Sequence, residues 1–208
     1  GTADPEKMID WAERMDRRPR HKARIAGLGD VAREAARRSP ARPREESWAL
    51  GYRRARALRG LLGAPRFRSF RELALALGAG SHYELAEPIN GVRAVRSDHD
   101  DGVYIHVRSH GKSPGAHSSH LFSFTRAVGD VVCFPEPARA AVNELHAAHR
   151  QAAGRAFAAE FLAPVEEIRS MAEDGRDMAS IADEFRVSTV VIGRQIENAD
   201  RIAAACAA

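Results

Sequence analysis

The sequence predicts an α+β fold that is mostly helical and contains one small antiparallel β-sheet. Two observations support this fold class. Apolar residues recur at helical spacing over most of the 208 residues, whereas residues 91–109 alternate apolar and polar side chains on both sides of an Asp-Asp-Gly turn. The composition, 44% hydrophobic and 29% charged, is ordinary for a globular chain long enough to bury a substantial core.

The N-terminal region is expected to be helical and basic. Residues 5–38 read as one or two helices with a break near Pro19, and 39–47 reads as a linker because it holds two prolines and no periodicity. Residues 1–70 hold 18 Lys and Arg against 9 Asp and Glu, while the remainder holds 14 against 19. This asymmetry is typical either of a solvated Arg-rich surface or of a region that contacts nucleic acid or an acidic partner. The candidate nucleic-acid contacts are Arg17, Arg18, Arg20, Lys22, Arg24, Arg53 and Arg54.

Two helices are expected next. An apolar stripe ending at a glycine predicts a helix over 48–63. The second helix, over 69–78, has Ser69 as its N-cap and Glu72 three positions later, which is a capping box.

The period then changes to that of a β-hairpin over 91–109. Its apolar positions are expected to face one way, and they are Val92, Ala94, Val103, Ile105 and Val107. A loop over 111–119 follows. The rest of the chain is expected to be helical, over 119–133, 137–162, 164–173, 178–186 and 188–204.

Two of these helices carry the polar residues that bear on function. Arg126 and Asp130 lie four residues apart in the 119–133 helix, so their side chains can meet. The 137–162 helix places His149 and Glu160 on one stripe, with His146 beside it. We take His146, His149 and Glu160 as candidates for a pocket or an interaction surface.

The stretches "FSFTRAVGD" (122–130) and "RAFAAEFLAP" (155–164) resemble the ImmA/IrrE family of metallo-endopeptidases. The resemblance extends over about 48–198 and implies a zincin-like helical core. It divides the chain into a basic arm and linker (1–47), a metallopeptidase-like domain (48–175) and a closing helical segment (176–208).

The family's zinc chemistry needs two His one turn apart, a third ligand, and a Glu that takes a proton from the metal-bound water. In this resemblance Arg126 and Asp130 stand in place of the two His, Ala127 in place of the Glu and Ala153 in place of the third ligand. A guanidinium stays protonated and repels Zn²⁺. We therefore expect no catalytic residue, no metal and no cofactor, and we expect Arg126 and Asp130 to form an ion pair where the metal would lie.

Histidines leave an alternative open. His106, His110, His117 and His120 precede the first of the two helices, and a displaced metal site formed by Asp130, His146 and His149 is the alternative to ordinary polar packing. Glu144 and Glu160 are the only evident candidates for its general base.

The closing segment has the apolar spacing of a helix-turn-helix, with Ser188 at the start of the second helix. A DNA-reading helix carries Arg, Lys, Asn or Gln in its first turns. This one begins with apolar residues and reaches Arg194 and Gln195 only later, which favours packing onto the core.

The expected function is a catalytically inactive, metallopeptidase-like domain that works as an interaction or regulatory module in bacterial or phage transcription regulation. Its expected partner is a protein, such as a repressor, or a second copy, with DNA as a further candidate through the basic region. The alternatives are an active metallo-endopeptidase with unorthodox ligands that cleaves a repressor, and a DNA-binding regulator. The two cysteines form no disulfide framework, and no stretch resembles a membrane helix or a signal peptide, so we expect a cytoplasmic protein without a membrane partner.

Overall fold

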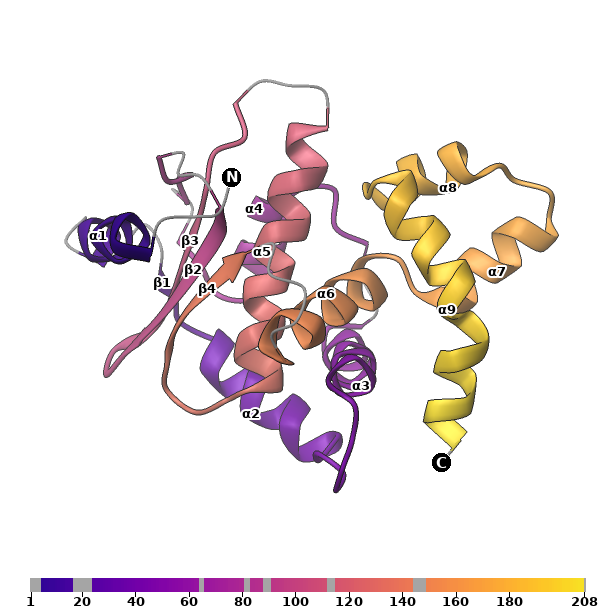
Figure 1. Cartoon of the computed structure of the whole chain (residues 1–208), viewed down its shortest axis with the longest axis horizontal. Coiled ribbons are helices and arrows are strands. Elements are labelled where there is room, and N and C mark those ends of the chain that lie inside the picture. Colours follow the sequence, from indigo (N-terminus) through magenta and orange to yellow (C-terminus); the bar gives the residue numbers. More distant parts are fainter. Residues whose placement is uncertain are drawn as a thin grey trace.

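The fold is α+β and mostly helical, as predicted, in the computed structural model shown in Figure 1. The structure describes residues 5–16, 24–63, 66–80, 83–87, 91–111, 115–143 and 149–207. Its elements in chain order are α1 (Pro5–Asp16), β1 (Arg24–Ile25), α2 (Leu28–Arg38), α3 (Ser47–Leu61), α4 (Phe70–Ala76), β2 (Val92–His99), β3 (Gly102–Val107), α5 (Ala116–Cys133), β4 (Arg139–Asn143), α6 (His149–Leu162), α7 (Val165–Glu173), α8 (Met178–Phe185) and α9 (Thr189–Ala207). None of the described helices is long and apolar enough to cross a membrane.

The sheet has the strand order β1-β3-β2-β4 with antiparallel neighbours. The predicted hairpin is confirmed, since His99 pairs with Gly102 across the turn. The expectation that Val92 shares a face with Ala94 is wrong. The pairing of β2 with β4 is irregular between these two residues, so Ala94 packs in the main core while Val92 joins a separate cluster with Trp11. A β-bulge of this kind shifts the alternation by one residue.

The two faces of the sheet are covered differently. Helix α5 packs on one face and helix α2 joins it there, and this side holds the main core. Helix α1 lies against the other face, where Trp11 and Met15 are buried (Figure 1).

Helices α3, α5 and α6 pack closely through small residues. A methyl group at Gly129 of α5 would come within 2.6 Å of the Phe157 ring of α6. Gly51 of α3 similarly faces the backbone of α6 at Ala153. These helices therefore approach closely, and little room is left between them.

The expected long helix over 137–162 is wrong. Residues 139–143 form strand β4 on the edge of β2, and helix α6 begins only at His149. Alanine-rich sequence favours a helix locally, but pairing with the exposed edge of β2 overrides that preference. Helix α5 also starts earlier than expected, at Ala116, inside the predicted loop.

The N-terminal region is not wholly a separate arm. The main core includes Ile25 of β1 and Leu28, Ala32 and Ala35 of α2. Helix α2 is amphipathic, and its apolar side packs against α5 and α3. The predicted break at Pro19 lies outside the described residues.

Helix starts follow the sequence signals well. Ser69 accepts a hydrogen bond from the backbone N–H of Glu72, and the Glu72 carboxylate accepts one from the N–H of Arg68. Asp177 caps α8 by accepting from the N–H groups of Ala179 and Ser180 at 2.9 Å. Helices α7, α8 and α9 lie close to the predicted spans 164–173, 178–186 and 188–204.

Candidate functional site

The four residues at the metal-site positions of the resemblance are all buried where α5 meets α6. Arg126 and Asp130 are about 5% exposed, and Ala127 and Ala153 are fully buried. They come from the two helices that the sequence indicated, although α6 is shorter than expected. The charged members must therefore find partners inside the protein.

Asp130 is bound by two arginines, neither of which is Arg126. Arg150 Nε donates to its Oδ1 at 2.8 Å and Arg150 Nη2 to its Oδ2 at 2.6 Å, while Arg96 Nη1 donates to Oδ2 at 3.0 Å. Arg150 also stacks on Phe134, with 4.8 Å between the guanidinium carbon and the ring centroid. The expected ion pair between Arg126 and Asp130 is wrong within the described residues, because the sheet and α6 supply other cations to this carboxylate.

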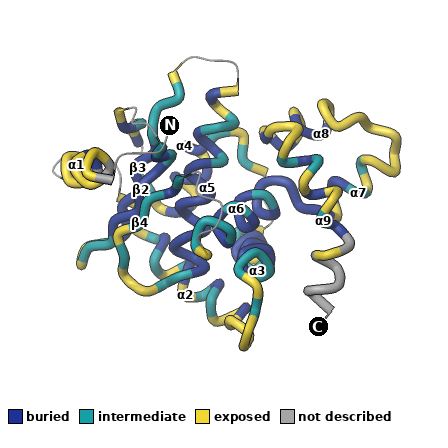
Figure 2. Tube along the Cα trace, in the orientation of Figure 1, coloured by how far each residue is buried: buried dark blue, intermediate teal, exposed yellow. Residues whose placement is uncertain are grey.

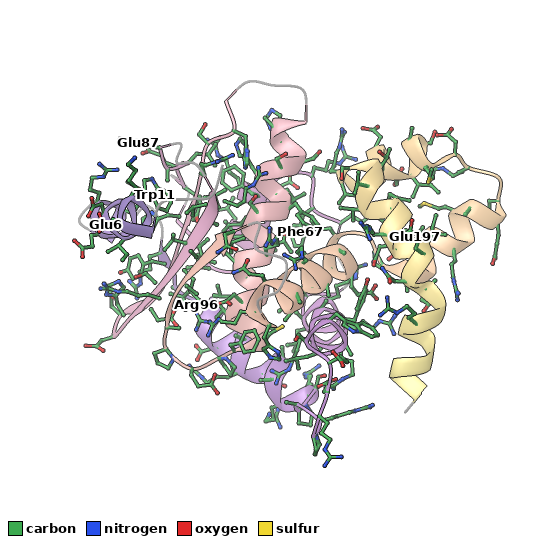
Figure 3. The ribbon with its side chains drawn as sticks, viewed as in Figure 1. Glu6, Trp11, Phe67, Glu87, Arg96 and Glu197 are labelled. Carbon is green, nitrogen blue, oxygen red and sulfur yellow. The ribbon has the colours of Figure 1, made fainter. Side chains whose placement is uncertain are left out.

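Arg96 is the most deeply buried charge in this group, with no exposed surface. Its guanidinium reaches from strand β2 to the end of α5 and donates at 2.7 Å to the carbonyl oxygens of Phe134 and Glu136. It also pairs with the carboxylate of Asp98, two residues along its own strand. Figure 3 labels Arg96, which joins the sheet to the helical core.

Arg126 points toward β4 and α6. Its Nη2 donates to the carbonyl oxygen of Asn143 at 2.6 Å and to Gln151 Oε1 at 2.9 Å. The same Gln151 amide accepts from the backbone N–H of Asn143 at 3.0 Å and donates to the carbonyl oxygen of Ala141 at 2.7 Å. Arg126 and Gln151 together bind the outer edge of β4.

These residues do not fit a zinc ion. Both oxygens of Asp130 are occupied by guanidinium groups, Ala127 and Ala153 offer no ligand atom, and Arg126 brings a positive charge. Among the described residues, no group of three or more His, Cys, Asp or Glu side chains is arranged to hold a metal ion.

The histidines that the structure describes do not gather around Asp130. His149 is exposed at the start of α6, where its Nδ1 lies 2.5 Å from Ser47 Oγ and its ring 5.4 Å from that of Phe134. His146 lies outside the described residues.

His110 and His120 contact each other near the start of α5. His120 Nε2 accepts the backbone N–H of His110 at 2.8 Å, and burial together with His117 lowers the pKa of His120. This imidazole is therefore held neutral as a hydrogen-bond acceptor.

Glu160 is a buried internal residue instead of an interaction residue. Arg56 Nε donates to its Oε1 at 2.7 Å, and the N–H of Val165 and the amide of Gln195 donate to its Oε2 at 3.1 and 3.3 Å. Burial raises the pKa of Glu160, and the nearby Arg56 opposes the rise. Its bonds join α6 to α3, to the first residue of α7 and to α9.

Two of the candidate nucleic-acid contacts are committed to internal bonds. Arg53 pairs with Glu45 at 2.6 Å, and buried Arg54 donates to the carbonyl oxygen of Val132 at 3.0 Å. Both are therefore unsuited to binding phosphate. Arg24 is exposed on β1. Arg17, Arg18, Arg20 and Lys22 lie outside the described residues.

In the helix-turn-helix-like pair α8 and α9, Gln195 faces the core, whereas most of the other described polar residues are exposed. Gln195 is fully buried and donates to the carbonyl oxygen of Ala163 at 2.8 Å. Thr189, Val190 and Arg194 are exposed on the same helix. This half-buried helix offers only one cation in its first two turns.

Sequence reasoning missed Arg96, Arg150 and Gln151. A usable signal existed for Arg96, because it alternates with Ala94 and Asp98 on the inward face of the predicted hairpin. A charge at such a position requires a buried partner of opposite charge. Gln151 had no comparable signal, since it binds a strand that was expected to be helix.

The one cysteine thiol that the structure describes in detail, Cys133, is also internal. Burial raises its pKa to about 12, so it stays protonated and is a poor nucleophile.

No protein-family model, curated protein or solved structure matches this chain.

Proposed function

We propose that this chain is a catalytically inactive, metallopeptidase-like domain that acts by binding a protein partner, within transcription regulation. The main support for the proposal comes from the two ion pairs that Asp130 makes. Its carboxylate is bound by Arg96 and Arg150, so the position that the family resemblance assigns to a ligand serves as the centre of a buried ion cluster.

An active peptidase with unorthodox ligands is supported less well. Asp130 is the only oxygen ligand among the four motif positions, and a metal would have to displace two guanidinium groups to reach it. Breaking a buried ion cluster costs several kcal/mol, roughly 3–5, before any metal bond forms.

DNA binding through the basic region is also supported less well. Arg53 and Arg54 were two of its seven candidate contacts, and both are held in internal bonds. Nonspecific DNA binding depends on exposed cations that release counterions.

The proposal is tested by finding the partner and asking whether it is bound or cut. Proximity labelling in cells identifies candidates, and calorimetry with the purified 208-residue chain measures the affinity of each one directly. We expect a protein that binds equally well in EDTA and in zinc and stays intact on a denaturing gel. Zinc-dependent cleavage of the partner overturns the proposal in favour of the peptidase. Salt-sensitive DNA binding without a protein partner overturns it in favour of the DNA-binding regulator.

A further inference from the structure

His120 lies in the second turn of α5 and is 5% exposed. Helix α5 is buried along most of its length and is exposed in its first turn (Figure 2). The Nε2 of His120 accepts the backbone N–H of His110 at 2.8 Å, and the two ring centroids lie 5.0 Å apart. Phe70 of α4 contacts the same imidazole, with 6.0 Å between the ring centroids. This hydrogen bond joins the backbone that follows β3 to α5.

The hydrogen bond requires that His120 is neutral. A backbone N–H can only donate, so Nε2 must offer a lone pair, and the neutral ring then carries its proton on Nδ1. An imidazolium donates from both ring nitrogens. Protonation of His120 therefore places two N–H donors against each other, and the hydrogen bond to His110 is lost.

The charged and titratable groups around this hydrogen bond are mostly basic. They are Arg71 of α4, which contacts the Phe70 ring, Arg93 of β2, Arg108 after β3 and His117 of α5, with the exposed Glu84 and Glu87 on the segment that pairs with Arg108. Arg93 Nη1 and Arg108 Nη2 lie 3.3 and 3.4 Å from the Nδ1 of His110. Burial and the nearby His117 lower the pKa of His120. The neutral ring is therefore the favoured state at neutral pH.

We propose that His120 is a pH-sensitive switch, which holds the backbone of His110 on α5 when it is neutral and releases it when it is protonated. The backbone N–H groups of Arg108 and Ser109 donate to the carbonyl oxygens of Arg93 and Ala86, so the release begins at His110. From Leu121 onward α5 packs in the main core and stays in place. This inference does not depend on the proposed function.

The direction of the pH response follows from the proton balance. The pKa of His120 in the folded state lies below its ordinary value of 6.5, so the released state binds the proton more readily. The stabilisation is fully present above pH 6.5 and is lost as the pH falls from there through the folded-state pKa. A single proton bound with the ordinary pKa weakens the closed state by at most about 30-fold at about pH 5.

Amide hydrogen exchange, measured by NMR on the 208-residue chain, tests the switch at His110. Protection factors are compared, because they correct for the intrinsic pH dependence of exchange. We expect the factor of His110 to fall by about ten-fold between about pH 7.5 and about pH 5, while that of Arg108 changes by less than about two-fold.

Two variants assign the response to His120. His120→Gln keeps an acceptor oxygen near the position of Nε2 and does not titrate, so the protection of His110 should be the same at both pH values. His149→Gln, which changes an exposed histidine on α6, is the matched control and should respond as the parent does.

A constant protection factor at His110 in the parent overturns the switch. A fall that persists in His120→Gln overturns it as well, since another group then titrates. If His120→Gln loses its helical circular dichroism, the imidazole nitrogen chemical shifts of the parent replace it. They should show Nε2 of His120 unprotonated at about pH 7.5 and protonated with a midpoint below about 6.5. A proton on Nε2 at the higher pH overturns the hydrogen bond on which the switch rests.

Discussion

Asp130 and Glu160 are both buried carboxylates on neighbouring helices, yet the protein holds them in different ways. Asp130 accepts from two guanidinium groups, one of them on the fully buried Arg96. Glu160 accepts from one guanidinium, on the partly exposed Arg56, and otherwise from neutral amides. The first is the centre of an ion cluster, and the second is an acid placed among hydrogen-bond donors.

The difference shows how a site can keep its charged residues without a metal. At Asp130 one buried carboxylate offsets two guanidinium groups, so removing it leaves the fully buried Arg96 with Asp98 as its remaining carboxylate partner. At Glu160 the burial cost is only partly offset, which is why its pKa is raised. The two centres should therefore respond differently to mutation.

The largest effect is expected at Asp130. Asp130→Ala leaves Arg96 buried without its carboxylate partner from α5 and should lower the free energy of unfolding by about 3–5 kcal/mol. Chemical denaturation measures this. Asp183→Ala, which removes an exposed pair with Arg186, is the control and should cost at most about 1 kcal/mol. Equal costs for the two variants would contradict the idea of a buried ion cluster.

Arg126→Met should cost about 1–3 kcal/mol, because it removes the donor to Asn143 and Gln151 while keeping most of the side-chain volume. The same denaturation experiment measures it. A stabilised variant would show that the guanidinium is kept for a reason other than stability, since buried polar groups can be replaced favourably by apolar ones.

Glu160→Gln should change stability by about 1 kcal/mol, and the change should depend on pH. The folded state raises the pKa of Glu160 above 4.5, so the folded state binds this proton more readily than the unfolded one. The resulting stability is fully present below pH 4.5 and is lost as the pH rises through the folded-state pKa. Glutamine never ionises, so the variant should gain stability relative to the parent as the pH rises. A pH-independent difference would mean that Glu160 is not the titrating group.

His149→Ala should have the smallest effect, below about 0.5 kcal/mol, because the imidazole is exposed and contacts Ser47 at the surface. Thermal unfolding of this variant beside Asp130→Ala compares an exposed residue with the buried ion cluster. A large loss at His149 would place the histidine in the cluster after all.

The sequence predicted the local structure well and the long-range pairing poorly. Ser69 signalled the N-cap that the structure contains, although Glu72 accepts from the N–H of Arg68 and not from that of Ser69. The Asp-Asp-Gly turn signalled the hairpin. Strand β4 was missed because its alanines fit a helix locally, and only the distant edge of β2 makes them a strand.

The four motif positions lie buried on α5 and α6, but the bonds of Arg126 and Asp130 differ from the expected ones. Arg126 and Asp130 have helical spacing that allows an ion pair, and that spacing says nothing about competitors from other elements. Arg96 reaches Asp130 from the sheet and Arg150 reaches it from α6. A pattern within one helix cannot rank these partners, because their distances depend on the packing of three elements.

Strand β4 is an edge strand of the sheet. The unpaired N–H and C=O groups of an edge strand can pair with a strand of another molecule, which leads to aggregation. Here the side chain of Gln151 makes the two hydrogen bonds, to Ala141 and Asn143, that the main chain of an added strand would make. One amide thus terminates the ladder and removes the template for growth into a continuous intermolecular sheet. In this respect the residue works as a safeguard of solubility, supplied by a neighbouring helix and not by the strand it protects.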